Sequence, residues 1–100
     1  MSVIQRSDIY LKDEESVTRF HEIFLSRLPK IESTGGRFLQ VYANQDDPFH
    51  LMFLARWQSI EHYETYMSWA GEQPDRERVG ALMAKAPDHA WLAEVGDWLP

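Results

Sequence analysis

The segment 49–55, FHLMFLA, constrains the fold most, because it is apolar at both odd and even positions. Alternate side chains of a β-strand point to opposite faces of the sheet, so a strand of this kind removes both faces from water. The segment 38–42, FLQVY, is largely similar. The polar loop 44–48 joins a strand over 37–43 to one over 49–57, which predicts a β-hairpin.

The part of the chain before the hairpin predicts a strand and a helix. Residues 3–11 mix β-branched, aromatic and polar side chains, as strands do. The acidic run at 13–15 suits a helix N-terminus, where carboxylates meet the positive end of the helix dipole. Apolar residues at steps of three and four then indicate an amphipathic helix that Pro29 ends or kinks; they are Val17, Phe20, Phe24, Leu28 and Ile31.

The part after the hairpin predicts two more helices and a last strand. Ser59 is a suitable N-cap for a helix with Ile60, Tyr63, Met67 and Ala70 on one face. Pro74 or Asp75 begins a short helix ended by Pro87, with these residues inward: Val79, Leu82, Met83 and Ala86. Residues 89–98 read as a strand. The order predicts a single α+β domain over 1–100, a ferredoxin-like four-stranded antiparallel sheet with helices on one face.

Helices on one face leave the other face of this sheet uncovered. Its apolar residues would then stay in water, and the simplest cover is a second copy of the same sheet, since symmetric dimers are the commonest oligomers. The pattern of the hairpin strands therefore predicts a homodimer.

Composition excludes several classes of function. The chain has no cysteine, so disulfides and thiolate metal sites are ruled out. The net charge of −6 argues against nucleic acid. No apolar run reaches the roughly 18 residues of a membrane span, and Arg6 and Asp8 interrupt any signal peptide, so a cytoplasmic location is the default. No pair of histidines has a metal-ligand spacing and no nucleotide-binding fingerprint occurs, so no metal or cofactor is expected.

Three residues are candidates for chemistry. His21 lies about 40° from Val17 on a helical projection, so we expect it to face the sheet, either as a base or as a core histidine with one hydrogen bond. Trp57 shares strand parity with Phe53 and either packs in the core or lines a pocket. Tyr63 is on the inner face of the second predicted helix, as a core residue or as a phenol that donates to a substrate oxygen.

Several local motifs occur in a recognisable order. A strand precedes an acid-started helix, Gly35 and Gly36 open a second strand, and a hairpin ends in LARWQS at 54–59, with a helix directly after Ser59. In this the sequence resembles the antibiotic biosynthesis monooxygenase family, whose members are dimeric α+β barrels. Haem-degrading relatives use a histidine nine or ten residues after the tryptophan; Tyr66 and Met67 stand there, which disfavours haem degradation.

The resemblance implies an activity and a set of site residues. Trp57 and Tyr63 match the pocket-lining pair of the cofactor-free anthrone oxygenases, whereas an asparagine of that group falls on Phe53. The implied function is a cofactor-independent monooxygenase that acts with O₂ on a small aromatic substrate of the polycyclic phenolic or quinol type, with Trp57 and Tyr63 catalytic. His21 joins them as the expected catalytic base on the ground of its helical position alone, not of the resemblance. The expected substrate-binding residues are Phe20, Phe24, Phe53, Met67 and Arg76. Two alternatives remain open: a non-oxidative polyketide cyclase or isomerase, and a non-catalytic dimeric barrel that binds a small apolar ligand.

Overall fold

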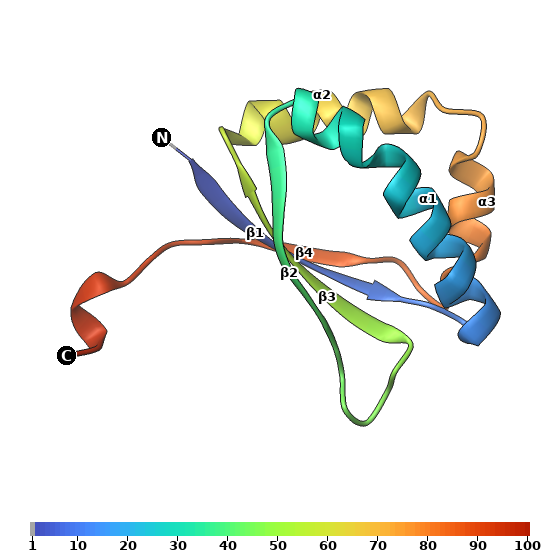
Figure 1. Ribbon diagram of the computed structural model, residues 1–100, viewed down its shortest axis with the longest axis horizontal. Helices are drawn as coiled ribbons and strands as arrows, with labels where there is room; N and C mark the ends of the chain where they lie inside the picture. Colours follow the sequence, from blue (N-terminus) through green and yellow to red (C-terminus); the bar gives the residue numbers. More distant parts are fainter. Residues whose placement is uncertain (1) are drawn as a thin grey trace.

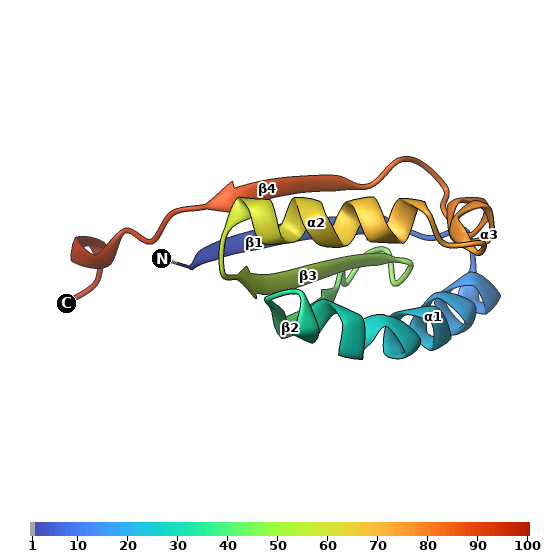
Figure 2. The same cartoon turned by 90° about the horizontal axis from the view of Figure 1, so that it is seen from above.

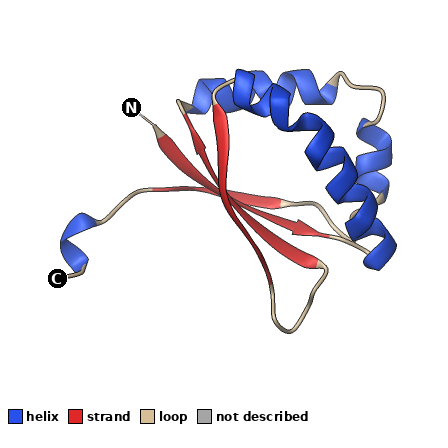
Figure 3. Cartoon of the chain, viewed as in Figure 1, coloured by secondary structure: helices blue, strands red, loops and turns tan. Residues whose placement is uncertain are grey.

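A computed structural model describes residues 2–100 and places all long helices on one side of one sheet (Figures 1 and 3). The expected order of elements is confirmed. The elements are β1 (Val3–Tyr10), α1 (Glu14–Ser33), β2 (Gly36–Ala43), β3 (His50–Trp57), α2 (Ile60–Gly71), α3 (Arg76–Ala81), β4 (Asp88–Leu92) and the 3₁₀ turn η1 (Gly96–Trp98).

The sheet has four strands in the order β2-β3-β1-β4, and every neighbouring pair is antiparallel. This confirms the ferredoxin-like α+β fold. In the central strand β1, Gln5 lies opposite Ala55 on one side and Trp91 on the other. Because side chains alternate, Gln5 and its neighbours of the same parity face the helices, while Arg6 and Asp8 face the open side of the sheet. Figure 2 shows the helical layer from above.

The predicted helix starts are confirmed by their caps. The carboxylate of Asp13 accepts a hydrogen bond from the backbone N–H of Ser16 at 2.8 Å, and the hydroxyl of Ser59 accepts one from His62 N–H at 3.2 Å. Pro29 does not end the helix, because α1 continues to Ser33. Pro29 is on the exposed side of the helix, so water can replace the hydrogen bond that its ring removes.

The core forms where the end of α1 and the face of α2 meet β3. Its buried members are Ile31, Ala55, Trp57, Tyr66 and Ala70. The turn from α1 into β2 depends on two glycines. Gly35 has a φ of 100°, and a Cβ on Gly36 would lie 2.7 Å from the Trp57 ring. The backbone of β2 therefore touches the indole directly.

Some predicted boundaries and orientations differ from the structure. The last strand ends at Leu92 rather than at residue 98, and the chain then runs away from the sheet, so that Trp98 is 82% exposed (Figure 1). With Gly96 in this stretch and no neighbouring strand beyond β1, residues 93–98 have no partner to extend the ladder. Ile60 and Ala86, expected to face inward, are exposed.

The open face of the sheet is mixed rather than wholly apolar. Asp8 accepts two hydrogen bonds from Arg6, each of 3.1 Å, and lies 2.8 Å from His50 Nε2. Burial raises the pKa of Asp8, but the hydrogen bonds from Arg6 and His50 outweigh that effect and leave the pKa below its usual value. By strand parity the apolar residues Ile4, Met52, Leu54 and Leu92 share this face.

Candidate functional site

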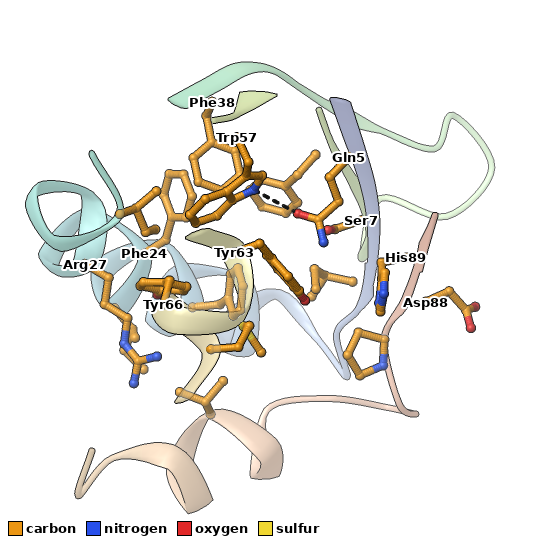
Figure 4. A pocket seen from close by; sticks show the side chains of 18 of the residues that line it. Gln5, Ser7, Phe24, Arg27, Phe38, Trp57, Tyr63, Tyr66, Asp88 and His89 are labelled. Atoms are coloured by element: carbon orange, nitrogen blue, oxygen red, sulfur yellow. Dashed lines mark hydrogen bonds between the residues drawn. The ribbon is translucent and has the colours of Figure 1, made fainter. Parts of the chain in front are cut away.

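A pocket of about 230 Å³ lies between the helices and the sheet, and it takes side chains from all four strands and all three α-helices (Figure 4). This volume is below that of common ligand pockets, which measure about 300–1,000 Å³. Its walls are mostly aromatic and aliphatic; they include Phe20, Phe24, Phe53, Trp57, Tyr63 and Met67. The space suits a compact apolar molecule.

The aromatic walls pack edge to face. The rings of Phe24 and Phe38 lie 4.8 Å apart at 70°, and those of Trp57 and Tyr63 lie 5.4 Å apart at 80°. These separations and tilts are the favourable ones for aromatic pairs. The rings of the pocket wall therefore hold one another in place. They belong to α1, β2, β3 and α2.

One polar pair is buried among these rings. The indole N–H of Trp57 donates to the amide oxygen of Gln5 at 3.2 Å, and the two residues are 2% and 3% exposed. Figure 4 shows this bond as a dashed line. The amide nitrogen of Gln5 is also buried and has no hydrogen-bond partner among residues 2–100. The pocket thus contains a free N–H donor.

Most of the residues predicted from the sequence come together in this pocket. Trp57 and Tyr63 both line it, one from the end of β3 and the other from the first turns of α2. Four of the five expected substrate-binding residues also line it: Phe20, Phe24, Phe53 and Met67. Their chemical roles stay predictions, but their shared location gives the hypothesis a site.

His21 is not in the pocket, and the expectation that it faces the sheet is wrong. Its side chain is exposed. The inward face of α1 runs through Phe20, Ile23, Arg27 and Ile31. On a helical projection His21 lies about 110° from the centre of that face. Val17, from which its orientation was inferred, lies with Leu28 at only one border of the buried stripe.

Arg76 also lies outside the pocket, where it is exposed and donates to the backbone carbonyl of Gly71 at 3.2 Å. The arginine that lines the pocket is Arg27, which forms an ion pair with Asp75 and lies 5.8 Å from the Trp69 ring centroid. Arg27 is seven residues after Phe20 and four before Ile31, so helical spacing could have identified it.

His89 is a pocket residue that the sequence reasoning missed. It projects from β4 opposite Ser7, and its ring lies 5.9 Å from that of Tyr63. The side chain is exposed, which places it at the pocket rim. His89 and Trp91 are alternate residues of one strand, and such residues share a face of the sheet. The sequence could therefore have placed His89 on the same face as Trp91.

Burial raises the pKa of the Tyr66 phenol, although a hydrogen bond from Arg27 opposes this effect. Tyr66 therefore stays protonated in the pocket wall. Within residues 2–100, no group of three or more histidine and carboxylate side chains is arranged to hold a metal ion. In the same range, no helix has both the length and the apolar character needed to cross a bilayer.

The geometry defines an antiparallel ferredoxin-like domain with an apolar pocket between sheet and helices, and solved structures share this fold. A protein from Bordetella bronchiseptica with the provisional name antibiotic biosynthesis monooxygenase is 14% identical, with a TM-score of 0.76; the match covers 94% of this chain and 97% of that one. One of the same provisional name from Nitrosomonas europaea is 11% identical, with a TM-score of 0.73, over 96% and 92%.

A NIPSNAP family protein from Agrobacterium tumefaciens also matches, at 8% identity and a TM-score of 0.70, over 100% of this chain and 98% of that one. No protein-family model and no curated protein sequence matches this chain. The expected resemblance to antibiotic biosynthesis monooxygenases is thus confirmed for the fold. Because proteins of different names share that fold, activity must be argued from the pocket.

Proposed function

We propose that this protein is a cofactor-independent monooxygenase that oxidises a small polycyclic phenolic or quinol-type molecule with O₂ in the pocket between sheet and helices. The observation that carries the proposal is an aromatic-walled cavity with a buried, unpartnered N–H donor on Gln5. Apolar walls favour the hydrocarbon rings, and the donor favours an oxygen substituent that gains negative charge. Two of the structurally similar proteins, from Bordetella bronchiseptica and Nitrosomonas europaea, have names of the same class, which supports the proposal.

The proposed reaction converts a ring methylene group and O₂ into a ring carbonyl group and water. A methylene flanked by aromatic rings and conjugated to a carbonyl loses a proton and becomes an electron-rich anion. The anion passes one electron to O₂, and the two radicals combine to a peroxide. Protonation of that peroxide and loss of water leave the new carbonyl. All atoms and electrons come from substrate and O₂.

The pocket residues support the steps that need a protein. Trp57 and the phenylalanines pack against the rings, and the phenol of Tyr63 donates a hydrogen bond to the oxygen substituent. His89 is the imidazole at the rim, 5.9 Å from the Tyr63 ring, and we assign it as the proton acceptor. His21 has no part in this assignment, because it lies on the exposed side of α1.

Oxygen uptake tests the proposed activity. With anthrone as substrate, the protein is expected to consume O₂ well above the buffer rate, and His89→Ala is expected to lower that excess about 100-fold or more, as the loss of a general base does. His21→Ala is the matched control and is expected to keep the wild-type rate. An oxygen electrode with subtraction of the spontaneous reaction gives the measurement.

Two results would contradict the proposal. If O₂ uptake with anthrone and with several hydroquinones equals the buffer rate, the protein is not an oxygenase for these substrates. Substrate turnover under argon would instead indicate a cyclase or isomerase. If His89→Ala and His21→Ala behave alike, the assignment of the proton acceptor is wrong. Binding without any turnover would indicate a non-catalytic ligand-binding barrel.

We also propose that the protein is a homodimer joined through the open face of its sheet. Tyr42 and Leu92 on that face are 53% and 43% exposed, and a second copy would cover them. Sedimentation at micromolar concentration is expected to give about twice the 11.8 kDa chain mass. Leu54→Arg, on the open face, is expected to give a folded monomer, whereas Leu25→Arg, on the exposed side of α1, is expected to leave the dimer intact. A wild-type monomer would contradict this arrangement.

A further inference from the structure

Within residues 2–100, only one of the two polar atoms of the Gln5 side-chain amide has a hydrogen-bond partner. Trp57 Nε1–H lies 3.2 Å from the amide oxygen, and the amide nitrogen has no partner within residues 2–100. An indole nitrogen can only donate, so the atom that it meets must be the amide oxygen. The contact therefore fixes the orientation of the amide group and leaves the NH₂ group as the free end.

Gln5, which carries the free NH₂ group, lines the floor of the pocket. Gln5 belongs to β1, the strand between β3 and β4, and its side chain lines the cavity on the helix side of the sheet. Figure 4 shows the amide nitrogen turned away from Trp57 and toward Ser7. With only 3% of Gln5 exposed, bulk water cannot satisfy this donor. A buried donor without a partner costs about 1–3 kcal/mol, so a ligand that supplies an acceptor gains by meeting it.

We propose that Gln5 is the recognition residue of the pocket, and that its ligand is a small aromatic molecule with a ring ketone oxygen, or the derived enolate or phenolate oxygen, directed at the amide NH₂ group. The inference rests on the proposed function in taking this pocket as the place where a small aromatic molecule binds. It adds that the oxygen belongs to a ring ketone or its enolate or phenolate, and that the NH₂ group of Gln5 determines the selection of that oxygen.

The charges around the pocket narrow the ligand further. Arg27 is already paired with Asp75, so a carboxylate or phosphate would find no free counter-charge there. Moving a localised charge into an apolar cavity without such a partner is costly. A ketone oxygen is neutral, and an enolate spreads its charge over the ring system. Both accept a hydrogen bond at a lower desolvation cost than a carboxylate does.

Trp57 acts on this recognition through Gln5 rather than through the oxygen itself. Its only N–H is used in the contact with the amide, so the indole contributes packing area and the orientation of the donor. Trp57 is therefore a positioning residue for the oxygen of the ligand. Loss of the indole N–H would free the amide to turn its oxygen toward the ligand, which repels a ketone.

Binding of two matched probes under argon tests the inference without any oxidation. The probes are 1-tetralone, which carries a ring ketone, and tetralin, which has the same rings without oxygen. In ¹⁵N-labelled protein, with the side-chain amide of Gln5 assigned by triple-resonance NMR, 1-tetralone is expected to move the Gln5 NH₂ proton signals downfield. Tetralin is expected to shift the signals of the aromatic residues in the pocket wall but to leave the two Gln5 NH₂ proton signals unshifted.

Affinity ratios give a second readout. The preference for 1-tetralone over tetralin is expected to fall about three- to ten-fold in Gln5→Met, the range that one neutral hydrogen bond supplies. Taking the ratio cancels the difference in water solubility between the probes. Gln45→Met, an exposed glutamine of the hairpin loop outside the pocket, is the control and is expected to keep the wild-type ratio.

The outcomes separate this inference from the proposed function. Three results would each overturn the role of Gln5, even if anthrone-dependent oxygen uptake is found. The Gln5 NH₂ signals could stay in place while other pocket signals shift with 1-tetralone, or the affinity ratio could be unchanged in Gln5→Met. The third result is that no pocket signal shifts at millimolar 1-tetralone. If the Gln5 NH₂ signals shift but no oxygen uptake is found, the result would support Gln5 as the recognition residue and contradict the proposed oxygenase activity. The NMR readout uses the wild-type chain, so it holds even if Gln5→Met does not fold.

Discussion

Replacing Trp57 with alanine is expected to lower the free energy of unfolding by about 3–5 kcal/mol, the usual cost of removing a buried tryptophan. The indole is 2% exposed and packs against Tyr63 and Tyr66, with ring centroids 5.4 and 5.8 Å away. The variant also leaves the amide oxygen of Gln5 without its donor. Urea unfolding followed by far-ultraviolet circular dichroism, at fixed protein concentration, gives the measurement.

Trp98 provides the control for that experiment. It is 82% exposed in the 3₁₀ turn near the C-terminus, so Trp98→Ala is expected to change the free energy of unfolding by less than about 0.5 kcal/mol. The two variants remove the same side chain from sites that differ in burial. A loss below about 1 kcal/mol in Trp57→Ala would mean that the indole is not the centre of the core.

Replacing Gly36 with alanine is expected to lower the free energy of unfolding by about 1–3 kcal/mol, the range for overpacking a core. The added methyl group would lie 2.7 Å from two atoms of the Trp57 ring and 2.9 Å from Ile31 Cγ2. Neither neighbour is the loose end of a flexible side chain. Denaturant unfolding checks the value, and Gly80→Ala is the control, since a Cβ at Gly80 would meet nothing within 4 Å.

A double-mutant cycle identifies the cause of the Gly36 effect. Trp57→Phe removes the outer ring atoms that the new methyl group would contact. Gly36→Ala is therefore expected to cost less in the Trp57→Phe background, with a coupling energy of at least about 0.5 kcal/mol. Strict additivity would mean that the penalty arises at Ile31 or in the turn at Gly35 rather than at the indole.

The fold was predictable because each of its signals is local. The acidic cap of α1, the polar loop of the hairpin and Ser59 before α2 fix the element order, and each depends on residues close together in the sequence. Predictions from local sequence failed where the surroundings in the folded chain determine the structure. Residues 93–98 have no strand to pair with, and Pro29 sits on a solvent-facing side where its missing hydrogen bond costs little.

The site was only partly predictable. Trp57 and Tyr63 follow from the family resemblance and from strand and helix periodicity, whereas His21 was misplaced because two residues at the border of a stripe suggest the wrong centre. Gln5 was missed for a different reason. Strand β1 carries apolar side chains at both parities, including Ile4 and Ile9, so the sequence does not tell which set faces the helices. Only packing decides that.

The alternation of β1 has an evolutionary consequence. Gln5 and Arg6 are adjacent in the chain, yet one belongs to the ligand pocket and the other to the ion-pair network on the opposite face. Single-residue replacements can alter either surface separately. A one-residue insertion or deletion within β1 would exchange the two surfaces at once, because it reverses every side chain downstream of it in the strand. Length changes are therefore expected to accumulate among homologues in the hairpin loop and the C-terminal tail, and to spare this strand.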